Sequence, residues 1–295
     1  METRSEKNLD IALEIEKDKK RTKNKKVFKV LLWIFIPLFL VFIVLYTTLR
    51  FIGNYGIVVR EYANYNAFFP EKISGLKIIQ FSDIHYNKYS SVSKIEKMVK
   101  LINKTNPDIV VFTGDLIDSE YQIDKETKEK IMNEFNNIKS KYGKYAIKGD
   151  EDKDEFKEIF DNSNFEILEN TIEKIYIGSS TIDLIALNED YNKDSVTKND
   201  SNFSIVLVHK PDLADQIIKD YNAQIIMAGH SLNGQIVLPL FGPLIKKEGA
   251  KKYCSSYYRI NNTDLYVSGG LGNSKYEFRL FNHPSINFYR LRTNK

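Results

Sequence analysis

Cysteine is almost absent from this chain of 295 residues, which contains only Cys254. A single cysteine cannot form an intramolecular disulfide bond, and it excludes metal sites built from several thiolates. The chain also lacks the G-x-S-x-G motif of serine hydrolases and the G-x-x-x-x-G-K-[ST] motif of phosphate-binding loops. The folded part must therefore be held by its hydrophobic core, and any metal site must use oxygen and imidazole ligands.

Charge of either sign is missing from one stretch of twenty residues, 30–49. At about 1.5 Å per residue, this stretch is long enough to cross the roughly 30 Å hydrocarbon layer, so we predict a transmembrane helix, in which Pro37 is tolerated. A cleavable signal peptide is the alternative, but its apolar region spans only about 7 to 15 residues and ends in a small-residue cleavage site. The sequence has neither feature, and it has no twin arginine or nearby cysteine, so an uncleaved signal anchor is expected.

Basic residues are concentrated on one side of this stretch. Eight lysines and arginines lie within residues 17–29, whereas only Arg50 and Arg60 lie within a dozen residues after the stretch. The positive-inside rule then predicts a cytoplasmic N-terminus and an extracytoplasmic region 50–295 in the cell membrane. Residues 1–29 hold ten basic and six acidic residues, and this surplus equals the whole net charge of +4. The basic balance therefore orients the chain and can touch anionic lipid, and no nucleic-acid partner is expected.

Beyond residue 57, short apolar β-branched runs alternate with helical patterns. The runs LKIIQFSDIH and PDIVVFTGDLID end abruptly in polar residues, and apolar residues recur at helical spacing between them. This predicts a β-α-β unit with functional residues at the strand ends. A second helix is expected at about 125–141 and an exposed loop at 188–202. Further runs that end at a polar or glycine-rich point are KYAIKGDEDK, DLIALNED, FSIVLVHKPDLAD, AQIIMAGH and LYVSGG.

Six side chains able to bind metal lie at these strand ends, namely Asp83, His85, Asp115, Asp150, His209 and His230. Any one of them alone is explained as a turn former, a helix cap or a hydrogen-bonded structural histidine. Six at equivalent points of the topology predict a metal site instead. Carboxylates with imidazoles suit Mn, Zn or Fe, and a shared carboxylate can hold two ions about 3.5 to 4 Å apart. Such a pair activates water and clamps a phosphate, so we predict phosphoester hydrolysis.

The motifs SDIH, FTGDLID, IKGDED, LVHKPD and AGHSLNGQIVLP, in this order, resemble those of the calcineurin-like metallophosphoesterases. They are most similar to the membrane-anchored bacterial branch, whose pattern runs D-x-H, G-D-x-x-D, G-N-H-D/E, a single H and G-H-x-H-x-G-Q. The resemblance covers about residues 57–292 and implies an α/β fold, a four-layer α/β/β/α sandwich with a dinuclear site at the strand ends. The division expected is a cytoplasmic basic segment 1–29, a signal anchor 30–49, a linker 50–56 and a metallophosphoesterase-like domain 57–295.

The resemblance also implies roles for single residues. The first metal would be held by Asp83 and His85, and Asp115 would bridge both metals as part of the catalytic centre. The second metal would be held by Asp150, His209 and His230, so one or two divalent ions (Mn, Zn or Fe) are expected. Three motif neighbours are expected to shape loops or support the ligands, namely Asp118, Lys210 and Gln235. His283 matches no catalytic position of the family.

Three positions depart from the family pattern. Asp150 replaces an asparagine and still offers an oxygen ligand. Glu151 takes the catalytic place of a histidine that donates a proton or hydrogen bond, so either its pKa is raised or the role of acid is vacant, at a loss of about 10² to 10⁴ in rate. Leu232 replaces a first-metal histidine and leaves three ligands, the number of an open catalytic zinc site. Asn233 would point the other way in an extended loop.

Two functions follow from these residues. The first is an extracytoplasmic metal-dependent phosphoesterase that hydrolyses a phosphodiester or pyrophosphate of an envelope lipid or wall polymer, with a divergent dinuclear site. The alternative is a catalytically inactive relative, a membrane-tethered binding or scaffold domain that keeps one metal. The sequence leaves both open, because it retains the expected bridging carboxylate but has lost a ligand and an acid.

Overall fold

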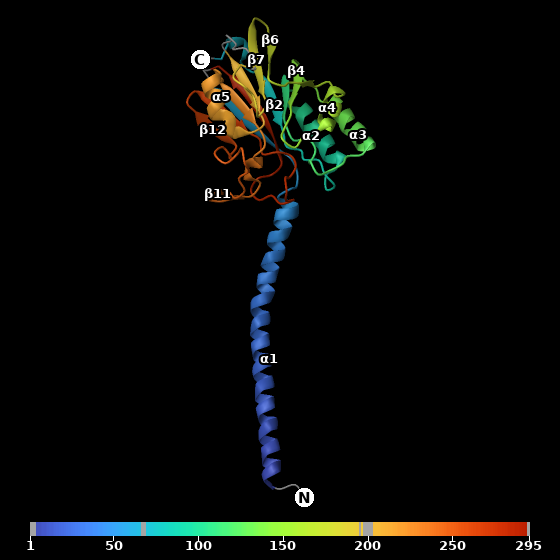
Figure 1. The fold of residues 1–295 in the computed structure, drawn as a ribbon, viewed down its shortest axis with the longest axis vertical. Helices are drawn as coiled ribbons and strands as arrows, with labels where there is room; N and C mark the ends of the chain where they lie inside the picture. The colour runs from blue at the N-terminus through green and yellow to red at the C-terminus, as the bar shows by residue number, and fades with distance from the viewer. Residues whose placement is uncertain (1–3, 66–68, 195, 197–202, 294–295) are drawn as a thin grey trace. The chain divides into compact units, whose positions relative to one another are not determined.

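The computed structural model describes most of the chain, namely residues 4–65, 69–194, 196 and 203–293. The chain divides into two units, Met1–Leu49 and Arg50–Lys295. The first unit contains the helix α1 (Arg4–Thr47), so the apolar helix expected from the sequence is confirmed (Figure 1). Among the described residues, this is the one helix that is long and apolar enough to cross a bilayer, over the segment Leu13–Ile52.

The second unit is built on two six-stranded mixed sheets. In spatial order, the first sheet consists of β1 (Val58–Tyr65), β14 (Ser285–Arg292), β2 (Lys77–Phe81), β3 (Ile109–Thr113), β4 (Gly143–Ile147) and β5 (Glu166–Ile167). The second sheet consists of β12 (Tyr257–Ile260), β13 (Thr263–Val267), β9 (Ile225–Ala228), β8 (Ser204–Val208), β7 (Ser180–Leu187) and β6 (Thr171–Ile177). Strands β2 to β5 are parallel to one another, as are β7, β8, β9 and β13.

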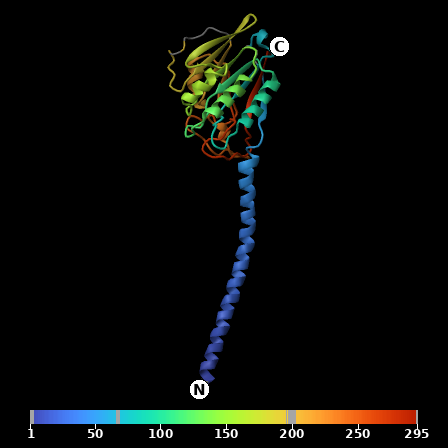
Figure 2. The same ribbon diagram turned by 90° about the vertical axis from the view of Figure 1, so that its right-hand side faces the viewer.

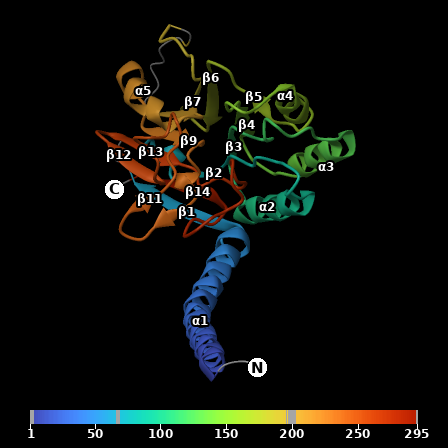
Figure 3. The same ribbon diagram turned by 60° about the horizontal axis from the view of Figure 1, so that its bottom comes forward.

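Helices cover the outer faces of both sheets. Three of them lie against the first sheet, namely α2 (Val92–Thr105), α3 (Lys125–Asn136) and α4 (Asp154–Asp161) (Figure 2). The short helix α5 (Ala214–Asp220) packs against the second sheet, on the opposite side of the domain (Figure 3). Apolar residues at helical spacing form the buried face of α2, as the sequence predicts. The predicted α/β/β/α sandwich is therefore confirmed.

One expected boundary differs in the structure. Helix α3 ends at Asn136 and not near residue 141, with Asn137 as its C-cap residue. The expected loop 188–202 lies partly outside the described residues, and its described part, residues 188–194 and 196, contains no helix or strand.

The core explains why the strands are almost continuously apolar. Residues such as Ile78 and Val111 face Leu207 and Met227 in a cluster between the sheets, while alternate residues of the same strands pack under the outer helices. A strand buried on both faces loses the alternation of a half-exposed strand. The sheets are also joined by Gln80, whose amide nitrogen donates to Thr113 Oγ1 and to the carbonyl of Ala228, both at 2.9 Å. This bridge lies where the carboxyl ends of the strands meet.

A single buried arginine organises the segment that precedes β14. The guanidinium of Arg279 is fully buried and donates to main-chain carbonyls, those of Gly269, Gly270, Gly272 and Asn282. Burial lowers its pKa to about 9, although the Asp83 carboxylate opposes this shift. The loop between β13 and β14 is therefore fixed against the strand ends.

Candidate metal centre

The side chains expected at the site come from loops that follow five different strands. Asp83 and His85 follow β2, Asp115 follows β3, and the others follow β4, β8 and β9. Several adopt the left-handed conformation that residues with a Cβ rarely use, with φ of 49° at Asp83, 43° at His85, 61° at Asp115 and 65° at His230. Such conformations cost free energy and persist only where the surrounding structure imposes them. The fold therefore imposes unfavourable backbone conformations that direct these side chains to one point.

The first donor group consists of Asp83, His85 and Asp115, all of which are fully buried. Nε2 of His85 lies 3.8 Å from Asp83 Oδ1 and 3.6 Å from Asp115 Oδ2. One potential ligand atom of each residue lies within 4.8 Å of the others. Asp83 is held by the main-chain amide of His230, which donates to both carboxylate oxygens at 3.0 and 3.1 Å.

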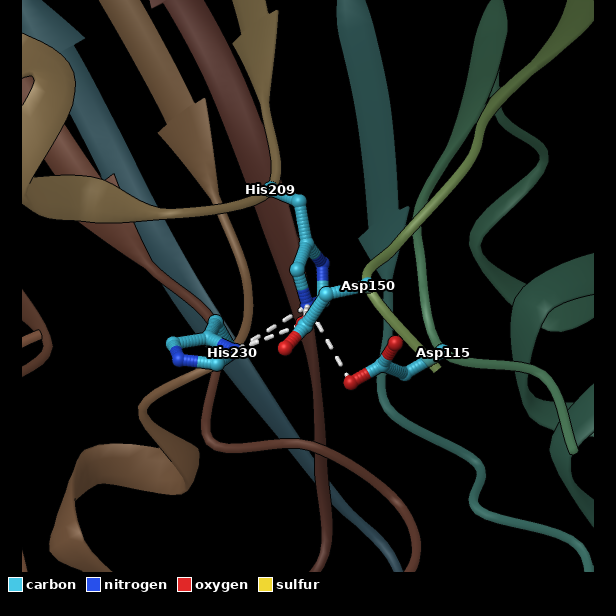
Figure 4. Close-up of side chains that lie close together, drawn as sticks. All are labelled: Asp115, Asp150, His209 and His230. Atoms are coloured by element: carbon cyan, nitrogen blue, oxygen red, sulfur yellow. Dashed lines mark hydrogen bonds and ion pairs between the residues drawn. The ribbon is translucent and has the colours of Figure 1, made fainter. Parts of the chain in front are cut away.

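The second donor group consists of Asp115, Asp150, His209 and His230 (Figure 4). Nε2 of His209 lies 3.1 Å from Asp115 Oδ2 and 3.0 Å from Asp150 Oδ1. Nδ1 of His230 lies 3.1 Å from the same Asp150 oxygen. Asp115 thus belongs to both groups, and the structure brings together all six side chains that the sequence singles out as ligands.

Main-chain carbonyls orient both imidazoles of the second group. Nδ1 of His209 lies 2.7 Å from the carbonyl of Thr113, and Nε2 of His230 lies 2.7 Å from the carbonyl of Glu248. A carbonyl only accepts, so these nitrogens carry the hydrogens and donate. In the neutral rings the other two nitrogens then present lone pairs to each other, 3.2 Å apart, and to the carboxylates. A cation between them would satisfy all of these atoms.

The pKa shifts indicate the same demand for positive charge. Burial raises the pKa of Asp115, but the adjacent His209 imidazole outweighs burial and lowers the pKa overall. Burial also raises the pKa of Asp150, and hydrogen bonds with both imidazoles outweigh it in the same way. For His209, burial lowers the pKa, yet the Asp115 carboxylate and further hydrogen bonds raise it well above the usual range. The carboxylates are held ionised.

Unsatisfied polar atoms also fit a metal. Both ring nitrogens of His85 and Oδ2 of Asp115 are buried without a hydrogen-bond partner in the described structure. A buried polar atom without a partner loses the hydrogen bonds it would make to water, and no other interaction offsets this cost in free energy. Such atoms are rare in folded proteins. Metal coordination through the donor set of imidazoles and carboxylates would supply that partner.

Glu151 lies beside His85. Its Oε2 is 3.7 Å from Nδ1 of His85 and accepts hydrogen bonds from the amide and hydroxyl of Ser119 at 3.2 and 3.3 Å. The interaction with His85 lowers the pKa of Glu151 in spite of burial, so the carboxylate is ionised. Burial lowers the pKa of His85, but Glu151 and then Asp115 outweigh it and raise the pKa.

Asp152 supports the site and was missed in the sequence. Its Oδ2 accepts from the amides of Asp115 and Gly149, both at 2.8 Å, and its Oδ1 accepts from the amide of Leu116 at 2.7 Å. Burial and then the nearby Asp115 charge raise its pKa to about 6. The acidic residue that ends the family pattern G-N-H-D/E marks this position, and that signal could have identified it.

Leu232 and Asn233 lie in a tight turn, so the expected extended loop is wrong. Both have positive φ, 50° and 49°, within the short helical turn Leu232–Gly234. The Leu232 side chain is buried. A Cβ atom added at Gly270 would collide with Cδ2 of Leu232 and would lie 2.9 Å from Cβ of Asp83, so both side chains lie next to Gly270. The two amide atoms of Asn233 are buried without hydrogen-bond partners in the described structure.

The remaining singled-out residues lie around the two groups. Asp118 accepts a turn hydrogen bond from the Glu120 amide at 3.2 Å. Nζ of Lys210 lies 3.6 Å from Asp150 Oδ2 and 2.6 Å from Glu189 Oε2. Gln235 and His283 contribute no atom to either group: the Gln235 amide donates to the carbonyl of Phe278 at 2.9 Å, and His283 is exposed.

The sequence of this chain is similar to those of known proteins. Residues 76–234 match the family described as calcineurin-like phosphoesterase. The chain is 29% identical over 258 residues to the uncharacterized metallophosphoesterase YkuE of Bacillus subtilis, covering 83% of this chain and 88% of that protein. It is 25% identical over 285 residues to the UDP-2,3-diacylglucosamine pyrophosphatase LpxG of Chlamydia muridarum, covering 74% and 84%. A solved archaeal phosphodiesterase is 14% identical, with a TM-score of 0.37 and coverage of 66% and 84%.

Proposed function

The chain belongs to the calcineurin-like phosphoesterase family, and from this premise we propose that it is a metal-dependent phosphoesterase with a divergent dinuclear site. It would hydrolyse a phosphodiester or pyrophosphate bond of a lipid or wall polymer of the cell envelope. The observation that carries the proposal is the pair of donor groups that share Asp115, with partnerless buried atoms on His85 and on Asp115 itself. The relative that is named a diacylglucosamine pyrophosphatase supports an acylated substrate.

The proposed metal ligands are the six donors already described. Asp83, His85 and Asp115 would hold one ion, and Asp115, Asp150, His209 and His230 would hold the other. Bound divalent ions supply positive charge to phosphoryl oxygens and lower the pKa of a coordinated water. The protein's own contribution is to fix these ligands, through the carbonyls behind both imidazoles and through the Asp152 carboxylate behind the Asp115 amide.

For Glu151 we infer a positioning role. Its ionised carboxylate faces Nδ1 of His85 while Nε2 of the same ring faces the two aspartates. A carboxylate behind a metal-binding histidine fixes the orientation of the ring and raises its basicity. This geometry favours support of His85 over proton donation to a leaving group. Without another acid, the rate should depend steeply on how good the leaving group is.

The decisive experiment uses the full chain, reconstituted in liposomes, with bis-nitrophenyl phosphate and added Mn²⁺. Wild type should release nitrophenol, and Asp115→Asn should reduce turnover by at least about 10³-fold because both groups lose their shared ligand. Asp161→Asn is the matched control, since Asp161 is exposed at the end of α4 and lies outside both groups. Absence of turnover above the Asp115→Asn background with Mn²⁺, Zn²⁺ and Fe²⁺ would rule the proposal out.

The inactive, membrane-tethered binding domain is the second candidate. It is favoured by Leu232, which is buried near Asp83 and offers no ligand atom to the first group. Elemental analysis separates the two functions. Two divalent ions per chain would support the phosphoesterase, whereas one ion or none, together with no turnover, would support the binding domain.

The N-terminal helix is proposed to be a signal anchor with its basic end in the cytoplasm. The support is the length and apolar character of residues 30–49, which lie within the candidate span Leu13–Ile52, and the excess of lysine and arginine at 17–29 before them. Protease digestion of right-side-out vesicles tests this orientation, because it should degrade the domain and spare the N-terminus.

A further inference from the structure

Large apolar side chains are exposed in one part of the second unit. Among the described residues after Ile52, five exposed leucine, isoleucine, valine or phenylalanine side chains occur, and one of them is the isolated Val58. The other four form the apolar rim, which we define as Leu240 (103% exposed), Phe241 (86%), Leu244 (62%) and Phe281 (68%). Single exposed apolar residues are ordinary, but a group of them marks an interaction surface.

Backbone pairing places the apolar rim on one small piece of structure. Leu240 and Phe241 lie in the tight connection between β10 (Val237–Leu238) and β11 (Gly242–Pro243), a hairpin at the edge of the domain (Figure 1). The amide of Leu244 donates to the carbonyl of Ile236 at 2.8 Å. Ile236 in turn pairs with Leu280, the neighbour of Phe281. The four side chains therefore belong to adjacent strands and turns.

The local backbone does not favour bulky residues at two of these positions. Leu240 has φ of 71° and Phe281 has φ of 53°, in the left-handed region that glycine and asparagine adopt more readily. Glycine or asparagine would suit both the turn geometry and the contact with water. Neither folding nor solubility accounts for large apolar side chains there, which indicates contact with an apolar partner.

The apolar partner that the chain brings to this face is a bilayer. The segment able to span it ends at Ile52, and two residues later the Asn54 amide donates to the carbonyl of Glu277 at 3.1 Å. Asn273 donates to Asn54 Oδ1 at 2.8 Å, so the first turn of the domain is fastened to the loop that leads to Phe281. Phe281 is four positions after Glu277, which is at most about 14 Å of chain. The end of the span and the apolar rim are thus joined through one short, hydrogen-bonded stretch of the domain.

Charged and aromatic neighbours fit the headgroup region. Exposed Lys246 follows Leu244 closely in the chain, and exposed Lys275 lies over the ring of Tyr276, 5.8 Å from its centroid. Lysine and tyrosine beside inserted apolar residues are the usual pattern of interfacial membrane contact, and lysine is attracted to anionic lipid.

The segment 237–248, which carries three of the four residues of the apolar rim, also reaches the metal centre. β10 begins seven residues after His230 in the chain, and the carbonyl of Glu248, just beyond the apolar rim, accepts from Nε2 of His230 at 2.7 Å. We propose that the apolar rim inserts into the surface of an anionic bilayer and holds the metal centre at headgroup level. The substrate class would then be a phosphoester or pyrophosphate carried by a membrane lipid. This second part, but not the insertion itself, rests on the proposed function.

The insertion is tested by the depth of a nitroxide spin label in the full chain, reconstituted in liposomes of phosphatidylglycerol and phosphatidylethanolamine. A label at Leu240→Cys is compared with a label at Tyr176→Cys, an exposed position on the β6 strand. Native Cys254 is buried, and burial raises the pKa of its thiol to about 11, so it should react little with the label. The protein without an introduced cysteine measures this background labelling. The label at 240 should collide more with oxygen than with a water-soluble nickel chelate, and the label at 176 should show the reverse. A water-exposed label at 240 would overturn the insertion, and a protein partner would then be the occupant.

The substrate class is tested with two substrates that share one leaving group. Soluble bis-nitrophenyl phosphate is compared with a diacylglycerol nitrophenyl phosphate embedded in the same liposomes, using wild type and the double variant Leu240→Asp with Phe241→Asp. The variant should hydrolyse the embedded lipid at least tenfold more slowly and the soluble diester at an unchanged rate. Equal loss on both, or no loss on the lipid, would overturn the substrate class. If wild type hydrolyses neither, the phosphoesterase proposal fails, while the label depth still decides the insertion.

Discussion

The two donor groups that share Asp115 differ in how completely they are built. The first group has three donors, all fully buried, and its imidazole His85 has no hydrogen-bond partner for either ring nitrogen in the described structure. The second has four donors, and a main-chain carbonyl orients each of its imidazoles. Ligand number and orientation both favour the second group. We therefore expect the second group to bind its ion with high affinity (the tight ion) and the first group to bind its ion with lower affinity (the loose ion), although both groups share Asp115. Metal should then bind in two steps.

The largest expected effect comes from removing one imidazole from each group in separate variants. His209→Ala should weaken binding of the tight ion by more than about 100-fold, because a direct ligand matters more than the supporting groups behind it. His85→Ala should leave one ion bound per chain. Elemental analysis after dialysis gives the stoichiometry of each variant. Equal loss of metal in both would contradict the asymmetry.

Restoring the missing ligand should make the two groups alike. Leu232→His adds an imidazole beside the first group and should tighten the loose ion by at least about tenfold. Titration with Mn²⁺, followed by isothermal calorimetry, would then show two steps of similar affinity. Leu232→Ala is the control for the loss of buried volume alone. Adding Glu151→His to Leu232→His tests whether the chemistry was lost at these positions, and a large gain in turnover is expected if it was.

A smaller effect is expected at Glu151. Glu151→Gln keeps the size of the side chain but removes the charge that faces His85, and it should weaken the loose ion by about 10-fold without changing the tight one. Glu120→Gln, at an exposed position of the neighbouring loop, is the matched control. A change in turnover at saturating Mn²⁺ with unchanged metal affinity would instead assign Glu151 a direct part in the chemistry.

Removal of metal should also lower the stability of the fold. An ion present at 100 times its dissociation constant stabilises the fold by about 2.7 kcal/mol, so a chelator should lower the melting temperature of the domain by about 5 to 10 °C. Most of this shift should accompany loss of the tight ion. Differential scanning calorimetry over a series of chelator strengths checks this, and a melting temperature that no chelator changes would argue against bound metal.

The strand-end rule made the fold and the convergence of donors predictable from the sequence. Parallel strands place their carboxyl ends at one edge of a sheet, so Asp83, Asp115 and Asp150 had to lie near one another once the three strands were recognised. The same rule applies to His209 and His230 on the second sheet. Local patterns of apolar residues were therefore enough to gather side chains that are far apart in the chain.

Other features depend on contacts that no local pattern specifies. The Asp152 carboxylate turns back to three amides, which only the folded loop brings together. The turn at Leu232 requires positive φ at a leucine, contrary to the preference of that residue, so the extended conformation was the natural expectation. The apolar residues around Leu240 likewise cannot distinguish a buried strand from an exposed hairpin without the surrounding structure.

The position of β14 has a consequence for how the domain is made. This strand lies between β1 and β2, although it follows every other strand of that sheet in the chain. Until β14 is delivered, β1 has no neighbour in the sheet and one side of β2 carries open amides and carbonyls. During synthesis the half-finished sheet can therefore pair with other chains and aggregate, and protection by a chaperone is most valuable in that interval.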